Sequence, residues 1–129
     1  MKILVVDDDK PLREEVRNIL IRAGYEADCA ASAVEGLALA KSTDYDFLLV
    51  DYRMPEHDGL WFMQHVTLPR KTTALLVTSH LDRSLIAKMF SAGASGYVIK
   101  PFDEEELLRH LEFHIQKKRG VKTAEEVLK

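Results

Sequence analysis

The sequence has little cysteine, no long hydrophobic run and no strong charge bias, and each absence excludes a class of protein. Its one cysteine, Cys29, cannot form an internal disulfide, which fits a reducing, cytoplasmic setting. No run approaches the ~18 apolar residues of a membrane span, and the N-terminus lacks the apolar stretch of a signal peptide. A net charge of −3 gives no reason to expect direct binding to nucleic acid or to a membrane.

Four short apolar runs stand out in the rest of the chain, which has 129 residues and is 47% hydrophobic, enough for one domain with one core. Each run ends in residues that can handle a phosphoryl group. Residues 3–6 precede Asp7-Asp8-Asp9, 47–50 precede Asp51, 74–77 precede Thr78-Ser79, and 97–99 precede Lys100-Pro101. Short continuous runs of this kind are typical of strands that are buried on both faces.

The segments between the runs have the apolar spacing of helices, so strands and helices are expected to alternate. A further, wetter strand is expected at 25–29 because its apolar residues alternate with acidic ones. This alternation predicts an α/β fold, with a parallel sheet and helices on both faces. The helices are predicted near 11–23, 32–42, 60–66, 82–92 and 103–118.

The carboxyl ends of parallel strands meet at one edge of a sheet, where α/β proteins bind their ligands. Asp7, Asp8 and Asp51 would therefore crowd together, and two unit charges ~4 Å apart repel by about 4 kcal/mol at a dielectric of about 20. A cation must offset this repulsion, and Mg²⁺ fits because it prefers oxygen ligands. A carboxylate can attack phosphorus to form an acyl phosphate, with Lys100 and Thr78 beside the phosphoryl oxygens.

Together, and at this spacing, these residues resemble the receiver domain of two-component response regulators, and in particular the chemotaxis regulators. The resemblance covers residues 1 to about 118. It implies a flavodoxin-like, doubly wound (βα)5 fold, a three-layer sandwich with strand order 2-1-3-4-5. The matching segments are Val5-Val6-Asp7-Asp8, Asp51-Tyr52-Arg53-Met54-Pro55 with Asp58-Gly59, Val77-Thr78-Ser79, and Ala92-Gly93-Ala94 followed by 96–102.

The resemblance also implies roles for the acidic residues. Asp51 would be the phosphoacceptor and a metal ligand, Asp8 would bind the metal directly, and Asp7 would bind it through water. The backbone carbonyl of Arg53 would be a further ligand of Mg²⁺, for which Mn²⁺ would substitute. By similarity, the donor is a phosphohistidine on a sensor histidine kinase or a phosphotransfer protein, and the domain catalyses only its own phosphorylation and dephosphorylation.

The remaining implied roles concern switching. Thr78, with Ser79 beside it, would contact the phosphoryl group, Tyr97 would be the switch aromatic, and Lys100 would bind the phosphoryl group before a cis bond to Pro101. A phosphoryl group on Asp51 would draw in the Thr78 hydroxyl and let Tyr97 rotate inward. The face formed by helix 82–92, strand 97–99 and helix 103–118 would then act on a partner protein or an output domain.

Several residues allow two interpretations. Arg53 and His80 each lie two positions past a site residue, and either set the lifetime of the acyl phosphate or point into solvent. His110 and His114 have the i, i+4 spacing of a metal pair, but we expect them on the surface beside an apolar helix face. Trp61 marks a contact surface or lies flat on the domain.

The main alternative function is a haloacid-dehalogenase-like phosphatase, which resembles the Asp7-x-Asp9 pattern after a strand. Lys10-Pro11 and the absence of a cap-sized insertion depart from that family. A flavodoxin-type flavin carrier is disfavoured because the acidic first loop would repel a flavin phosphate. Loss of the chemistry, leaving only a binding module, is disfavoured because all the site residues are present. Residues 119–129 are expected to be a charged tail or the start of a linker to an absent output domain, and the last helix with this tail is a possible homodimer contact.

Overall fold

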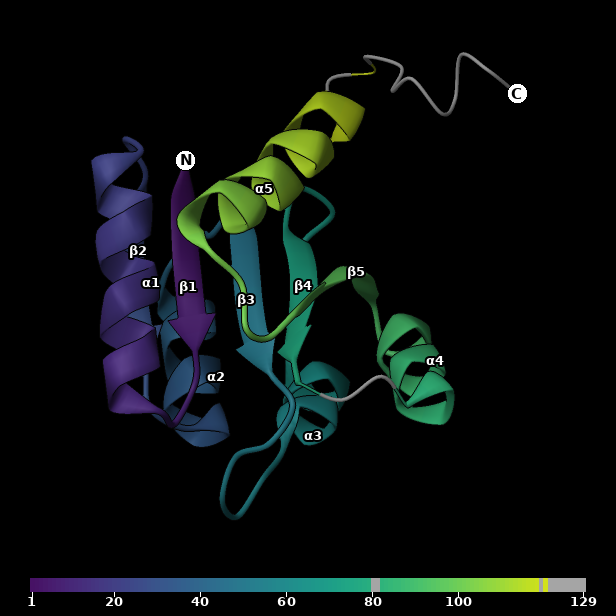
Figure 1. Ribbon diagram of the computed structural model, residues 1–129. Helices are drawn as coiled ribbons and strands as arrows, with labels where there is room; N and C mark the ends of the chain where they lie inside the picture. Colours follow the sequence, from purple (N-terminus) through teal and green to yellow (C-terminus); the bar gives the residue numbers. More distant parts are fainter. Residues whose placement is uncertain (80–81, 119, 121–129) are drawn as a thin grey trace.

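Strands and helices alternate along the chain in the computed structural model, which describes residues 1–79, 82–118 and 120 (Figure 1). The strands are β1 (Lys2–Val6), β2 (Glu26–Ala30), β3 (Phe47–Asp51), β4 (Thr73–Thr78) and β5 (Ala94–Ile99). All pair in parallel, in the order β2-β1-β3-β4-β5. The helices are α1 (Lys10–Arg22), α2 (Ala33–Ser42), α3 (Gly59–His65), α4 (Arg83–Ser91) and α5 (Glu104–Lys118). The predicted fold and strand order are confirmed.

Two layers of helices cover the sheet, and the alternation of side chains along β1 shows how. Ile3 and Val5 point to the face that is covered by α1 and α5, which lie at the left and across the upper front of Figure 1, respectively. Leu4 and Val6 point to the other face, which packs against α2, α3 and α4. The central strands are therefore buried on both sides, which is why they appear in the sequence as uninterrupted apolar runs.

Side-chain caps begin the helices close to where the strands end. Ser32 accepts a hydrogen bond from the Glu35 backbone N–H at 3.1 Å, and Glu35 accepts one from the Ala31 N–H at 3.0 Å. Asp103 accepts from the Glu106 N–H at 2.8 Å at the start of α5. Such caps satisfy backbone groups that the first helical turn leaves unpaired.

Strand β5 begins at Ala94, three residues before the predicted run. The small residues Ala94, Ser95 and Gly96 carry no apolar signal, although they pair with β4 across a register irregularity. Gly96 also explains the burial of His114, whose expected surface position is wrong: the side chain is 8% exposed. A Cβ at Gly96 would lie 2.8 Å from His114 Nε2, so the glycine leaves the space that the imidazole fills.

Trp61 lies flat on the domain, the second of the two interpretations of its place in the sequence. Its ring stacks on His57 with a centroid distance of 3.8 Å and on His65 with a distance of 4.2 Å. It also packs partly against the core on the α3 side of the sheet.

Among the helices of the described residues, none is both long and apolar enough to cross a bilayer.

Gly59 places α3 directly against the end of β3. Its N–H donates to the Tyr52 carbonyl at 2.7 Å, and a Cβ there would lie 2.5 Å from the Asp51 backbone oxygen. We therefore expect Gly59→Ala to destabilise the fold by about 2 kcal/mol, since the clash is with backbone rather than with a flexible side chain. Urea unfolding measures this loss, and a variant as stable as the parent would contradict the contact. Gly24→Ala separates the clash from backbone strain, because no atom lies within 4 Å of its added Cβ and only its φ of +94° disfavours alanine.

Candidate functional site

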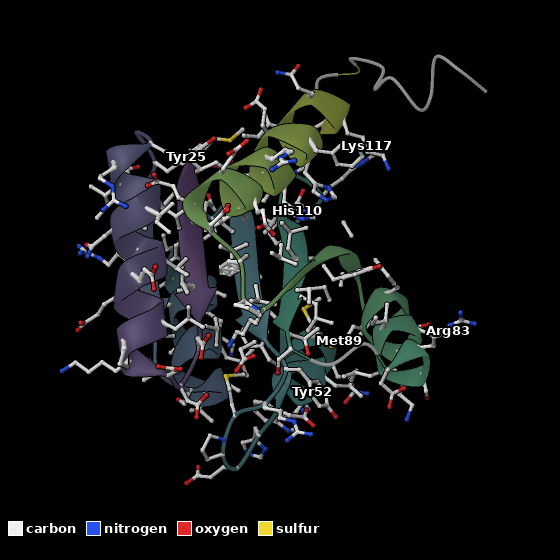
Figure 2. All side chains as sticks on the ribbon, viewed as in Figure 1. Tyr25, Tyr52, Arg83, Met89, His110 and Lys117 are labelled. Atoms are coloured by element: carbon white, nitrogen blue, oxygen red, sulfur yellow. The ribbon has the colours of Figure 1, made fainter. Side chains whose placement is uncertain are left out.

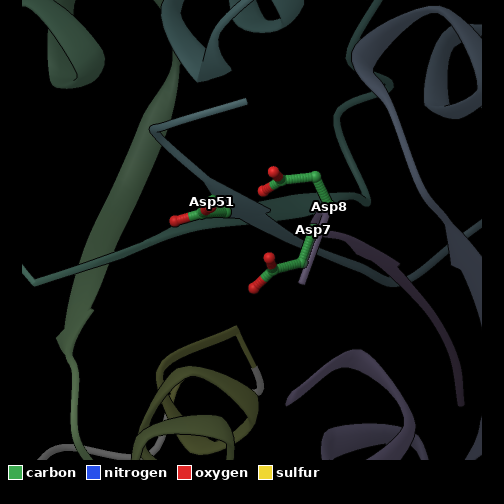
Figure 3. Close-up of side chains that lie close together, drawn as sticks. All are labelled: Asp7, Asp8 and Asp51. Atoms are coloured by element: carbon green, nitrogen blue, oxygen red, sulfur yellow. The ribbon is translucent and has the colours of Figure 1, made fainter. Parts of the chain in front are cut away.

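Three carboxylates gather at the carboxyl ends of β1 and β3. Carboxylate oxygens of Asp7, Asp8 and Asp51 all lie within 4.8 Å of one another, and Figure 3 shows the three groups turned toward a common space. Asp7 and Asp51 are buried, whereas Asp8 is exposed. Such a set of hard oxygen donors, open on one side, suits a divalent cation that keeps part of its water shell.

Backbone contacts hold the loop after β1 in place. Asp7 Oδ1 accepts a hydrogen bond from the Asp9 N–H at 2.9 Å, and Asp9 in turn caps α1 by accepting from the Leu12 N–H. Arg13 reaches back from α1 and donates to the Asp7 carbonyl at 2.8 Å. This role of Arg13 is not predictable from the sequence, where the only signal is an arginine one turn inside the helix.

Lys100, at the end of β5, inserts its ammonium group between the two buried acids. Its Nζ lies 3.0 Å from Asp7 Oδ2 and 3.2 Å from Asp51 Oδ1, and its side chain is 19% exposed. The following peptide bond, to Pro101, is cis as the resemblance implied. The structure thus brings together Asp7, Asp8, Asp51 and Lys100, as expected from the strand ends.

Burial raises the pKa of Asp51 to about 6, with the negative charge of Asp7 acting in the same direction and Lys100 opposing both. For Lys100, burial alone would lower the pKa, but the hydrogen bond to Asp7 and the charge of Asp51 outweigh it, and the pKa is raised. The site therefore holds its carboxylates at a cost in free energy, which a further cation would relieve.

Thr78 ends β4 at the same edge of the sheet and is buried, while Ser79 beside it is exposed. The Thr78 carbonyl accepts a hydrogen bond from the Lys100 N–H at 2.8 Å, which joins the ends of β4 and β5. Tyr97 on β5 is 39% exposed and meets Phe90 of α4 edge to face, with ring centroids 6.3 Å apart. The aromatic side chain thus lies on the outer surface between α4 and β5.

A second opening borders the acidic cluster on the side of the β3–α3 loop. This pocket of about 350 Å³ is lined by Asp8, Tyr52, Arg53, Met54, Pro55 and Asp58. The Arg53 side chain is exposed at its rim. His80, which the sequence analysis paired with Arg53, lies outside the described residues.

The family model of the response regulator receiver domain matches residues 3–112. The chain belongs to this family. Receiver domains are the signalling domains of response regulators, and the match does not favour the phosphatase alternative.

Curated relatives of this receiver domain include both long and short proteins. The chain is 34% identical over 108 residues to the transcriptional activator protein IrlR of Burkholderia pseudomallei, covering 84% of the chain but 47% of IrlR. It is 32% identical to the transcriptional regulatory protein ResD of Bacillus subtilis, of which it spans 45%. It is also 32% identical to the chemotaxis protein CheY of Pseudomonas aeruginosa, with 93% of the chain and 100% of CheY covered. The chain thus spans about half the length of the regulators and the whole of the chemotaxis protein.

Solved structures give the same result for the receiver fold. The chemotaxis protein CheY4 of Vibrio cholerae has a TM-score of 0.82 at 33% identity, with 87% of this chain and 96% of CheY4 covered. A CheY-like receiver domain from Methanospirillum hungatei has a TM-score of 0.86 at 28% identity, with 92% and 96% covered.

Proposed function

We propose that this chain accepts a phosphoryl group on Asp51 from a phosphohistidine of a sensor histidine kinase or phosphotransfer protein. The observation that carries the proposal is the buried Asp51 carboxylate, with a lysine ammonium at 3.2 Å and two more carboxylates next to it. In this step the Asp51 oxygen attacks phosphorus while the P–N bond to the donor imidazole breaks. The phosphoryl group leaves the histidine and becomes an acyl phosphate, and the imidazole keeps the bonding electrons.

Mg²⁺ is the cofactor that we propose for this site, held by Asp8, Asp51, the Arg53 backbone carbonyl and, through water, Asp7. When bound, the metal offsets negative charge on the phosphoryl oxygens. Lys100 supplies positive charge beside Asp51, at 3.2 Å from its Oδ1, and keeps the carboxylate oriented for attack. Mn²⁺ also prefers carboxylate and water ligands and would take the same place.

Phosphorylation would act on partners through the face formed by α4, β5 and α5. A dianionic group on Asp51 would attract the Thr78 hydroxyl, which with Ser79 would contact the phosphoryl oxygens. Tyr97, now half exposed beside Phe90, would turn inward into the space that Thr78 leaves. A partner protein or an output domain that binds this face would then distinguish the two states.

We further propose that residues 1–118 form the receiver unit and that 119–129 lead toward an output domain or form a tail. The family match ends at residue 112, and α5 ends at Lys118. Of residues 119–129, only residue 120 is among the described residues. The identity to IrlR and ResD, each about twice as long, is consistent with a further domain, whereas CheY matches along its whole length.

The decisive experiment is intact-mass measurement after incubation with acetyl phosphate, with and without Mg²⁺. We expect one added phosphoryl group, present only with Mg²⁺. Steady release of phosphate from a generic phosphate ester, with no adduct, would instead favour the phosphatase. An unmodified protein without turnover, after exposure to a panel of histidine kinases as well, would refute the proposal.

Mg²⁺ binding should weaken as the pH falls through the raised pKa of Asp51, about 6. The protonated acid cannot act as a ligand, so protons and metal compete. Between about pH 8 and about pH 5, we expect the affinity to fall by about tenfold for this one group, measured by calorimetry. In Asp51→Asn the affinity should be lower at about pH 8, and most of this pH dependence should vanish. Equal affinity of the parent at both pH values would contradict the proposed role of Asp51 as ligand.

Arg53 lies at the rim of the pocket beside Asp8, and we propose that its side chain slows water attack on the acyl phosphate. Arg53→Ala should then lose its phosphoryl group at least about threefold faster than the parent. The effect is expected to be modest because only an exposed side chain is removed. The decay is followed by mass after the donor is removed. Arg83→Ala is the control, as an exposed arginine on α4 outside this pocket. An unchanged lifetime would mean that Arg53 only points into solvent. The same comparison applies to His80→Ala.

A further inference from the structure

Basic and hydroxyl side chains surround another pocket, at the edge of the sheet opposite Asp51 and separate from the pocket beside Asp8. It measures about 260 Å³ and lies where β4 and β5 begin and α5 ends. Figure 2 shows Lys117 on this last part of α5, far from the strand arrowheads that mark the acidic site. The pocket is lined by Arg70, Thr72, Thr73, Ser95, His114, Lys117 and Lys118.

We propose that this pocket binds a small oxyanion through a phosphate group, either free phosphate or a phosphorylated metabolite. The site is independent of phosphorylation at Asp51. Its lining provides three cationic side chains and, among the described residues, no acid. Since Arg70 comes from the loop before β4 while Lys117 and Lys118 come from α5, the charges converge from two separate parts of the chain.

The charge of Asp46 acts on Lys118, but the two side chains form no ion pair. Asp46 pairs with Lys71, which does not line the pocket, at 3.9 Å, and it accepts a hydrogen bond from the Lys2 backbone N–H at 2.8 Å. Lys118 donates to the Lys71 carbonyl and keeps further N–H groups for an anion. The pocket therefore keeps a positive charge that no ion pair within residues 1–79, 82–118 and 120 removes.

Two buried polar side chains also line the pocket without a hydrogen-bond partner. His114 is 8% exposed and Thr73 is 5% exposed, and within the described residues neither side chain makes a hydrogen bond. Thr72 differs, because its hydroxyl donates to the Tyr45 carbonyl at 2.6 Å. Among the described residues, no fully enclosed side-chain N or O atom lacks a partner, so the His114 imidazole and the Thr73 hydroxyl keep access to the pocket, where a ligand can hydrogen-bond to them.

The dipole of α5 explains only part of this arrangement. Lysines in a last helical turn interact favourably with the negative end of a helix, which accounts for Lys117 and Lys118. It does not account for Arg70, which is not on the helix, or for a histidine that is buried among cations. Burial, followed by the charges of Lys117, His110 and Lys118, lowers the pKa of His114, so the ring is held in its neutral form. A bound anion would offset the lysine charges and raise this pKa again.

The test is an NMR titration of the full chain with inorganic phosphate and, separately, with glycerol phosphate. EDTA excludes metal from the acidic site, and chloride keeps the ionic strength constant. We expect saturable shifts of the His114 ring and Ser95 amide signals, together with a rise in the pKa of His114. Tighter binding of the ester would assign the site to a phosphorylated metabolite, and equal binding would assign it to free phosphate.

A pair of charge-matched variants decides the result. Arg70→Gln with Lys117→Gln should weaken phosphate binding by about tenfold or more, because it removes two charge-assisted contacts. Lys10→Gln with Arg109→Gln removes the same charge from exposed positions that do not line the pocket, and should bind like the parent. Urea midpoints confirm that both variants are folded. Shifts that do not saturate, or that weaken equally in both variants, would overturn the proposal.

Discussion

Asp51→Asn is expected to abolish phosphorylation by acetyl phosphate, leaving the protein mass unchanged where the parent gains one phosphoryl group. An asparagine amide lacks the nucleophilic oxygen that forms an acyl phosphate. The substitution is nearly isosteric at a side chain that is buried and faces Lys100 at 3.2 Å, so the fold should persist. Burial raises the pKa of Asp51 to about 6, so its negative charge destabilises the metal-free fold near neutral pH. Because asparagine removes that charge, metal-free Asp51→Asn should be at least as stable as the parent.

Two neighbouring acids provide matched controls for this result. Asp9 is exposed and caps α1, and because asparagine caps a helix as well as aspartate, Asp9→Asn should be phosphorylated like the parent. Asp8→Asn keeps the nucleophile but removes a carboxylate from the cluster. We therefore expect its phosphorylation rate to be about one tenth of the parental rate or lower, and to recover partly at high Mg²⁺. A phosphoryl adduct on Asp51→Asn at the parental level would assign the acceptor to another residue.

The parallel strands and the meeting of their ends could be predicted because the signals are local and repeated, whereas the strand order came from the resemblance to receiver domains. Buried parallel strands must be apolar on both faces, so runs such as 47–50 and 74–77 stand out against the amphipathic helices. Once the strands are parallel, geometry alone brings Asp7, Asp51 and Lys100 together, as the distances from Lys100 to both acids confirm. The part of the site that follows from topology was therefore accessible from sequence.

The features that depend on packing between distant segments were not accessible in this way. Gly96 carries no apolar signal in the sequence, yet its missing side chain makes the space that buries His114, eighteen positions later. The stack of Trp61 between His57 and His65 depends on how the β3–α3 loop folds back onto α3. Neither arrangement has a periodic signal, because each depends on the shape of a single partner rather than on a repeating face.

Lys100→Met is expected to cost about 3 kcal/mol of stability in the metal-free protein near pH 8, measured by urea unfolding in EDTA. Removing one partner of a buried ion pair leaves the other charge uncompensated, and here two carboxylates, Asp7 and Asp51, lose their shared ammonium at 3.0 and 3.2 Å. Methionine keeps most of the volume of the lysine stem, so the loss reports on charge more than on packing. Lys10→Met, at an exposed position on α1, is the control and should change stability by less than about 0.5 kcal/mol.

The dependence of this loss on pH and Mg²⁺ separates the electrostatic explanation from simple damage to the fold. The pKa of Lys100 is raised, so its stabilising charge is fully present below the ordinary lysine pKa and is lost only in strongly alkaline solution. Between about pH 5 and about pH 8 the change must therefore come from the acids: protonation of Asp51, whose pKa is about 6 even with the lysine present, relieves the repulsion as the pH falls. The cost of Lys100→Met should shrink to about 1 kcal/mol near pH 5.

Mg²⁺ should restore part of the stability near pH 8, and should stabilise the variant more than the parent because the competing ammonium is gone. A loss that is equal at both pH values and insensitive to Mg²⁺ would show that Lys100 acts through packing and does not compensate the charge of the two acids.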